Sequence, residues 1–132
     1  MLVRDMMIRD VITAERSISV KQCSDILYKR HVGAIIVVDT EKRVIGIFTE
    51  RDIIRVIAQD IPLNTPLEDV MTTNIITIQE DSTFGEAKEL MRLYRIRRIP
   101  VINTENKLVG LLSLRHILDE FFEMIPRTRT PS

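Results

Sequence analysis

A hydroxyl and a carboxylate lie three residues apart in the segment Gly46-Ile47-Phe48-Thr49-Glu50-Arg51-Asp52. The segment has the pattern of a strand that runs into a helix. The first N–H groups of a helix have no partner within it and attract anions, so the backbone and Thr49 could hold a phosphate while Asp52 accepts ribose hydroxyls. The same pair also fits a helix cap, in which Thr49 accepts a backbone N–H. On this segment alone, the cap is the favoured interpretation.

The segment belongs to an internal repeat. When the chain is shifted by 64 residues, residues 4–62 fall on residues 68–126 without a gap, and Gly46 coincides with Gly110. Such a repeat predicts two similar units that bury their apolar faces against each other and form related clefts between them. The chemistry of the two copies differs, because Ser113 and His116 occupy the places of Thr49 and Asp52.

Each copy is predicted to form a strand, a helix, two strands and a second helix. The expected strands are 11–13, 34–38 and 44–48 in the first copy, and 75–77, 99–102 and 108–112 in the second. Their β-branched runs and hairpin-length connectors are typical of small buried sheets. The closing helices must end before Pro62 and Pro126, because proline restricts the preceding residue. We therefore expect an α/β fold of two β-α-β-β-α units related by a pseudo-twofold axis, with small sheets flanked by helices.

The first helix of each copy has a start signal. Ser19-x-x-Gln22 and Thr83-x-x-Glu86 are capping boxes, in which two side chains satisfy each other's backbone N–H groups. The residues predicted to form the buried stripes are Val20, Cys23 and Leu27 in one helix, and Phe84, Ala87, Met91 and Tyr94 in the other. Cys23 is interpreted as a core residue, and His31 as a structural residue at the helix end, where a cation interacts favourably with the helix dipole.

The repeated β-α-β-β-α unit that ends in Gly-h-h-Thr/Ser-x-x-Asp, where h is apolar, resembles a pair of CBS domains, a Bateman module. The leading segments Asp5-Met6-Met7 and Asp69-Val70-Met71-Thr72, and the run Ile96-Arg97-Arg98-Ile99-Pro100-Val101, add to the resemblance. It covers nearly the whole chain. It implies two CBS repeats, at 1–62 and 63–126, that form one module. Residues 127–132 are expected to be a flexible tail, since chain ends are often poorly ordered.

The resemblance implies a main cleft that binds an adenosine-containing ligand such as AMP, ADP, ATP or S-adenosylmethionine. By position, Thr49 and Asp52 would contact phosphate and ribose. Arg97 and Arg98 match basic residues that meet phosphate, which suits the planar guanidinium group. The remaining residues of this main site would be Ile47, Ile76, Thr77, Ile96 and Pro100.

A second cleft is expected to bind more weakly. Its residues would be Ile12, Thr13, Val32, Gly33, Ala34, Ile36, Ser113 and His116. Here His116 replaces the ribose-binding carboxylate and Gly33-Ala34 replaces the arginine pair, so this cleft loses its charged partners. A neutral imidazole accepts one hydrogen bond and cannot receive two neighbouring hydroxyls as a carboxylate does. The alternative for His116 is a surface helix residue without a ligand role.

Composition excludes several classes of function. Lys+Arg and Asp+Glu are equal at 19 each, so the chain lacks the basic excess typical of nucleic-acid binding. Two distant histidines, one cysteine and four glycines supply no metal cluster, no nucleophile–base pair and no nucleotide-binding glycine motif. We expect no catalysis, no metal and no obligatory cofactor. The lone cysteine, and the absence of a signal peptide or an 18-residue apolar run, favour a cytoplasmic protein without a membrane segment.

The leading hypothesis is a regulatory binding module in energy sensing, which signals through an unknown protein target or through its own dimer. The resemblance suggests a homodimer, and Ile57, Phe121 and Phe122 would suit the contact unless they form intramolecular core. A structural or protein-interaction module with weak ligand binding is the alternative. Nucleic-acid binding through Arg92, Arg95, Arg97 and Arg98 is a weaker one.

Overall fold

A computed structural model describes residues 1–123, and the tail expected at 127–132 lies outside them. The described chain forms two three-stranded sheets, ordered β1-β2-β3 and β4-β5-β6. The strands are β1 (Thr13–Ala14), β2 (Ala34–Val38), β3 (Val44–Thr49), β4 (Ile78–Gln79), β5 (Arg98–Ile102) and β6 (Leu108–Ser113). The helices are α1 (Val20–Arg30), α2 (Glu50–Ala58), α3 (Phe84–Tyr94) and α4 (Leu114–Glu123), with short 3-10 helices η1 (Val3–Asp5) and η2 (Leu67–Asp69). The predicted α/β fold with β-α-β-β-α order in each repeat is confirmed.

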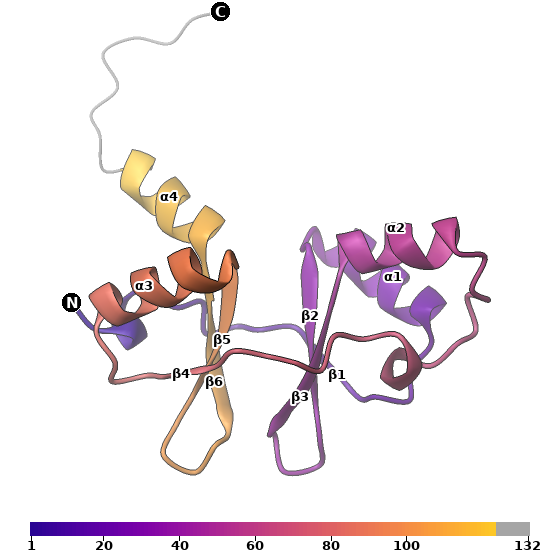
Figure 1. Cartoon of the computed structure of the whole chain (residues 1–132), viewed down its shortest axis with the longest axis horizontal. Helices are drawn as coiled ribbons and strands as arrows, with labels where there is room; N and C mark the ends of the chain where they lie inside the picture. The colour runs from indigo at the N-terminus through magenta and orange to yellow at the C-terminus, as the bar shows by residue number, and fades with distance from the viewer. Residues whose placement is uncertain (124–132) are drawn as a thin grey trace, which may run out of the picture.

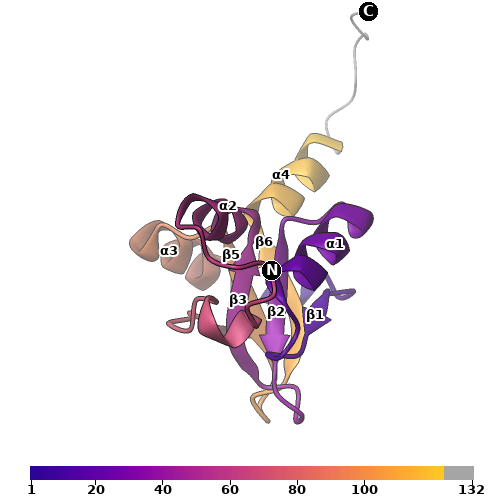
Figure 2. The same ribbon diagram turned by 90° about the vertical axis from the view of Figure 1, so that its right-hand side faces the viewer.

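The two repeats stand side by side, with both hairpin loops at one end and the helices towards the other (Figures 1 and 2). Both sheets pair their first strand in parallel and their last two strands antiparallel. No described helix is long and apolar enough to cross a membrane.

The first strands begin later than predicted, and by different amounts. Thr13 pairs with Ile36 in the first repeat, whereas in the second Ile78 pairs with Val101, one position further along. The Ile36 N–H donates to the Ile12 carbonyl at 3.1 Å. Pro100 occupies the equivalent position in β5 and has no N–H to donate. The parallel ladder of the second repeat therefore starts one residue later, and the expected strand at 75–77 is wrong.

The helix starts follow the sequence signals. Ser19 and Gln22 form the predicted capping box at α1, and Thr83 and Glu86 form its counterpart at α3. His31 closes α1 in the left-handed conformation, with its N–H on the Leu27 carbonyl. These local contacts set where each first helix begins and where α1 ends.

The hydrophobic core consists of two clusters that exchange segments between the repeats. Val3 and Met7, from the start of the chain, pack with Ile99 and Leu112 of the second repeat. Leu67 and Val70, from the start of the second repeat, pack in turn with Phe48 and other residues of the first repeat. Figure 1 shows the N-terminus beside α3. Each sequence repeat thus completes the core of the other, and this holds the two together.

Most predicted core residues are buried, but Phe84 is only partly buried and Tyr94 is exposed. Val20, Cys23, Leu27, Ala87 and Met91 are buried as the helical pattern indicated. Tyr94, the last residue of α3, is 50% exposed. The prediction of a buried Tyr94 is therefore wrong.

Apolar side chains remain exposed on the second helix of each repeat. Ile54 and Ile57 on α2, and Leu118, Phe121 and Phe122 on α4, are each at least 44% exposed. The alternative that Ile57, Phe121 and Phe122 form intramolecular core is wrong for the described chain. These residues are available for contact with another molecule.

Candidate ligand-binding clefts

Thr49 and Asp52 form a closed capping box at the start of α2. The Asp52 Oδ2 accepts from the Thr49 N–H at 2.9 Å and from the Thr49 hydroxyl at 3.1 Å, and Thr49 Oγ1 accepts from the Asp52 N–H at 3.4 Å. The Asp52 Oδ1 lies 3.5 Å from Arg55, which also donates to the Val70 carbonyl. The capping role that the sequence favoured is confirmed. Asp52 Oδ1 is the carboxylate oxygen that the box leaves for a further donor.

Ser113 and His116 form only half of the equivalent box at α4. The Ser113 hydroxyl accepts from the His116 N–H at 3.4 Å. The His116 imidazole turns along the helix instead, with its Nε2 3.1 Å from Glu120. The His116 side chain therefore does not accept from the Ser113 backbone N–H, as Asp52 does from that of Thr49. The start of α4 is thus less enclosed by its own side chains than the start of α2.

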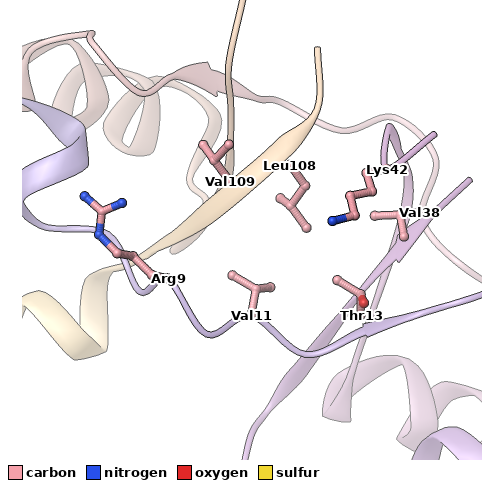
Figure 3. A pocket seen from close by; sticks show the side chains of 7 residues that line it. All are labelled: Arg9, Val11, Thr13, Val38, Lys42, Leu108 and Val109. Carbon is pink, nitrogen blue, oxygen red and sulfur yellow. The ribbon is translucent and has the colours of Figure 1, made fainter. Parts of the chain in front are cut away.

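The second set of predicted residues comes together around one cavity. A cavity of about 420 Å³ is lined by residues of both repeats, including Ile12, Val32, Gly33, Ala34, Ser113 and His116. Val11 also lines an adjoining cavity of about 280 Å³, which Thr13, Val38, Leu108 and Val109 border together with Arg9 and Lys42 (Figure 3). The two cavities form a cleft with Ser113, His116 and charged side chains at the α4 end, and with four apolar side chains beside Arg9 and Lys42 at the end near the hairpins. Ile36, predicted for this site, is fully buried in β2 and lines neither cavity.

The residues predicted for the main, first cleft do not line one common cavity. Neither Thr49 nor Asp52 lines the cavities of about 280, 630, 420 and 440 Å³ in the described part of the chain. Ile96 and Arg97 border a separate cavity of about 440 Å³ beside α3, and Arg97 and Arg98 border one of about 630 Å³ beside α4. Ile76 and Thr77 are half-buried, and Pro100 is buried.

The backbone hydrogen bonds of the two equivalent carbonyls, Ile12 and Ile76, also differ. In the first repeat the Ile12 carbonyl accepts from β2, whereas no backbone N–H of residues 1–123 donates to the Ile76 carbonyl. Ile47 exchanges backbone hydrogen bonds with Thr72, as Leu111 does with Ile8. The Ile76 carbonyl therefore has no backbone donor within residues 1–123, unlike the Ile12 carbonyl.

Charged residues that the sequence did not assign also line the second cleft. Arg98, which was assigned to the first site, borders the 420 Å³ cavity together with Arg115 and the carboxylates of Asp10, Glu50 and Asp119. The expectation that this cleft lacks charged partners is therefore wrong. Arg115 coincides with Arg51 in the repeat, but the repeat alone does not show which face of the helix points into a cavity.

Other reactive groups do not form a site in the described chain. Cys23 is fully buried, and burial, followed by the negative charge of Asp52, raises its pKa to about 11. Residues 1–123 contain no group of three or more His, Cys, Asp or Glu side chains placed to hold a metal ion. The clefts between the repeats are thus the main candidates for ligand binding.

Comparisons with known proteins agree with this arrangement. The inosine-5'-monophosphate dehydrogenase of Aquifex aeolicus (strain VF5) is 34% identical over 113 residues, which is 85% of this chain but only 23% of that protein. The CBS domain pair of protein MJ0100, in complex with 5'-methylthioadenosine and S-adenosyl-L-methionine, is 30% identical. It superposes with a TM-score of 0.84 over 95% of this chain and 98% of that one.

A second solved structure is similar to the same extent. The CBS domain protein PAE2072 from Pyrobaculum aerophilum, complexed with AMP, is 27% identical, with a TM-score of 0.82 over 93% of this chain and 99% of that one. The family model of the CBS domain matches residues 3–59 and again residues 67–123. This chain belongs to the CBS domain family and carries two CBS domains in tandem.

Proposed function

We propose that this protein is a non-catalytic regulatory module that binds an adenosine-containing ligand between its two repeats. The observation that carries the proposal is the 420 Å³ cavity, whose walls come from both repeats and which adjoins a second cavity lined by residues of both repeats. Related CBS pairs are described with S-adenosyl-L-methionine, 5'-methylthioadenosine or AMP. AMP, ADP or ATP as the ligand would make the module an energy sensor.

The second cleft has the chemistry that a nucleoside requires. Val11, Val38, Leu108 and Val109 offer apolar contact to a flat purine at one end (Figure 3). Ser113 and the start of α4 offer hydrogen bonds to sugar and phosphate at the other, where the first N–H groups of a helix favour an anion. A ligand that lies along the cleft would contact both repeats at once.

The first cleft is proposed to bind the ligand more tightly, through its carboxylate. Asp52 Oδ2 is used by the capping box, which leaves Oδ1 to accept ribose hydroxyls. The Ile76 carbonyl, which has no backbone donor within residues 1–123, can accept from an adenine amino group. Thr49, Thr77 and Ile47 would complete this cleft, as expected from the resemblance.

Ligand binding becomes a signal only if it favours one relative orientation of the repeats. A ligand shared by both repeats has that property, because its contacts are lost when the repeats move apart. The exposed apolar residues of α2 and α4 would then present a different surface to a second copy of the chain or to a target protein. We propose a homodimer through these helices, which sedimentation or light scattering would test.

Isothermal titration calorimetry with AMP, ATP and S-adenosylmethionine tests the proposal directly. We expect at least one of them to bind, and we expect Asp52→Ala to weaken the tightest binding event. His116→Ala is the matched control from the other repeat and should leave that event unchanged. No heat from any of the three ligands at millimolar concentration would contradict ligand binding.

The exposed apolar residues of α2 and α4 favour one alternative, a protein-interaction module with little ligand binding. Asp52→Ala also separates the two functions. An interaction module would keep its partner or its dimer unchanged when this carboxylate is removed, and would show no heat with any adenosyl compound.

A further inference from the structure

Each repeat receives the leading segment of the other through the same backbone hydrogen bonds. The leading segments are residues 1–7 and 65–71, and the docking segments that receive them are residues 80–84 and 16–20. The Arg4 N–H donates to the Glu80 carbonyl at 2.9 Å, and the Glu68 N–H donates to the Arg16 carbonyl at 3.0 Å. The start of the chain accordingly lies beside α3 (Figure 1). Because the two contacts are equivalent, the backbone does not select which segment docks where.

Apolar contacts and chain entropy do not select the exchanged arrangement either. Val3 coincides with Leu67 in the repeat, and both are fully buried. Docking within its own repeat would separate Arg4 from its contact by residues 5–15, whereas the observed contact encloses residues 5–79. Closing the longer loop costs more chain entropy. The exchange therefore needs a feature that disfavours docking within the repeat.

The charges at these contacts supply that feature, because they are reversed between the repeats. Arg4 coincides with Glu68, and Arg16 coincides with Glu80. In the exchanged arrangement each contact joins an arginine to a glutamate. Docking within the repeat would place Arg4 beside Arg16, and Glu68 beside Glu80. At no other position of residues 1–7 and 15–20 is the sign of a charge reversed in the other repeat.

The two pairs differ in how exposed they are. Arg16 Nε lies 3.6 Å from Glu68 Oε2, and both side chains are exposed. Arg4 and Glu80 are half-buried, and their charged atoms lie more than 4.0 Å apart. The Arg4 Nε is buried and has no hydrogen-bond partner within residues 1–123. Charges interact more strongly away from water, so the position of Arg4 is sensitive to the sign of its neighbour.

We propose that the reversed pairs Arg4–Glu80 and Glu68–Arg16 determine that each leading segment docks on the opposite repeat. Each charge attracts its segment to one docking segment and repels it from the other. Surface ion pairs contribute little to stability, but a choice between two similar surfaces needs only a small difference that has opposite sign at the two. The same repulsion disfavours docking of residues 1–7 of one chain on residues 16–20 of a second copy.

Nuclear magnetic resonance of the isotope-labelled, ligand-free chain tests this proposal. The variant Arg4→Glu/Glu68→Arg exchanges the charges of the leading segments and keeps the composition and the net charge. Each observed contact then joins like charges, so hydrogen-exchange protection of the Val3 and Leu67 amides should fall by about five-fold. Nuclear Overhauser effects from the Val3 amide to residue 82 should weaken, and effects to residue 18 should appear.

Reversal of all four charges should undo this effect. Adding Arg16→Glu/Glu80→Arg to the first variant again places opposite charges together in the exchanged arrangement. Protection of the Val3 and Leu67 amides should return to within about two-fold of the unmodified chain, as expected of paired residues. The matched control is Glu105→Lys/Lys107→Glu, which exchanges a pair 3.7 Å apart between β5 and β6. It should leave both amides unchanged.

A milder variant addresses one contact alone. Arg4→Gln removes the attraction to Glu80 and should lower protection of the Val3 amide by about two-fold, while that of Leu67 stays unchanged. Unchanged protection in both Arg4→Gln and Arg4→Glu/Glu68→Arg would overturn the proposal. An equal loss in the control variant would also overturn it, because the effect would then belong to surface charge in general.

The fully reversed variant decides the remaining outcomes. If Arg4→Glu/Glu68→Arg does not fold, recovery of the fold on reversal of all four charges would support the proposal. Continued loss of protection after full reversal would overturn it, because the four residues would then act singly and not as matched pairs. All of these measurements are made without ligand, so a negative result leaves the proposed function standing.

Discussion

The starts of α2 and α4 occupy equivalent positions in the two repeats but use their side chains differently. At α2 the Asp52 carboxylate closes a full capping box, whereas at α4 the His116 imidazole turns to Glu120 and the box stays half-formed. The open cavity lies beside α4. The comparison shows that a repeat can preserve a fold while the cap residue decides how much of each helix start is left for a ligand.

The segments that lead into each repeat extend the comparison. Met7 packs on Gly110 of the second repeat and Met71 packs on Gly46 of the first. The contacts are equivalent except in one respect. The backbone oxygen of Ile8 also lies 3.0 Å from the Cβ position at Gly110, whereas only Met71 side-chain atoms lie closest to the Cβ position at Gly46.

The largest difference between the repeats in the free energy of unfolding is expected when a methyl group is added at each of these glycines. Gly110→Ala would meet Met7 Cγ at 2.8 Å and the Ile8 backbone, so it should destabilise the protein by about 2–3 kcal/mol. Gly46→Ala meets Met71 Cγ at 2.8 Å but only a side chain that can rotate away, so about 1 kcal/mol is expected. Urea denaturation measures both free energies of unfolding. A Gly46→Ala variant as destabilised as Gly110→Ala would contradict the difference.

The next largest difference in the free energy of unfolding is expected when the cap residues of α2 and α4 are replaced. Asp52→Ala removes the return bond of the box at α2 and should cost about 1 kcal/mol of stability. His116→Ala removes no capping bond from its side chain and should change the free energy of unfolding by less than about 0.5 kcal/mol. Thermal or urea unfolding of the ligand-free variants gives both values. Asp52→Asn keeps an acceptor oxygen and should recover part of the loss, and equal losses at Asp52 and His116 would show that the half-formed box is not weaker.

Local sequence signals predicted much of this fold. The repeat gave the element order, and Ser19-x-x-Gln22 and Thr83-x-x-Glu86 marked the helix starts, because capping depends on residues that are neighbours in sequence. The exchange of leading segments was not predicted. Val3 and Leu67 have the same local pattern whichever repeat they pack on, so their apolar pattern does not decide it.

The site was predicted less well, for a related reason. Six of the eight residues expected at the second cleft line its main cavity, since the resemblance placed them by position. Arg98 reaches from the second repeat to the first, where its Nη2 lies 2.7 Å from the place where a Cβ on Gly33 would stand, and this contact depends on a long side chain and on empty space at Gly33. Neither the spacing of residues nor a comparison of the two copies measures such a distance.

The later start of the parallel ladder in the second repeat offers a smaller test. Pro100→Val gives β5 an N–H that can donate to the Ile76 carbonyl, as Ile36 donates to Ile12. The new hydrogen bond adds about 1 kcal/mol, and the loss of proline's restriction on the unfolded chain removes a similar amount, so net stability should change by less than about 0.5 kcal/mol. Hydrogen exchange should show a protected amide at position 100. An unprotected amide there would mean that proline is not the cause of the later strand start.

The smallest expected difference lies in the two hairpin turns. Asp39 Oδ1 accepts from the N–H groups of Glu41 and Arg43 at 2.9 Å each, and Asn103 Oδ1 accepts in the same way from Glu105 and Lys107. The Arg43 backbone N–H, followed by that of Glu41, holds the pKa of Asp39 below its ordinary value. A carboxylate whose folded pKa is lowered contributes its stability above the unfolded pKa and loses it as pH falls through the folded value.

Acid should therefore loosen the first hairpin while the second, with an amide in place of the carboxylate, keeps its turn. Amide chemical shifts of Glu41 and Arg43, followed from about pH 6 to about pH 2, should titrate with Asp39, and those of Glu105 and Lys107 should not. Asp39→Asn makes the two turns alike and should remove the titration. If the Glu105 and Lys107 amides moved together with those of the first turn, the acid response would belong to the module as a whole, because Asn103 has no proton to gain.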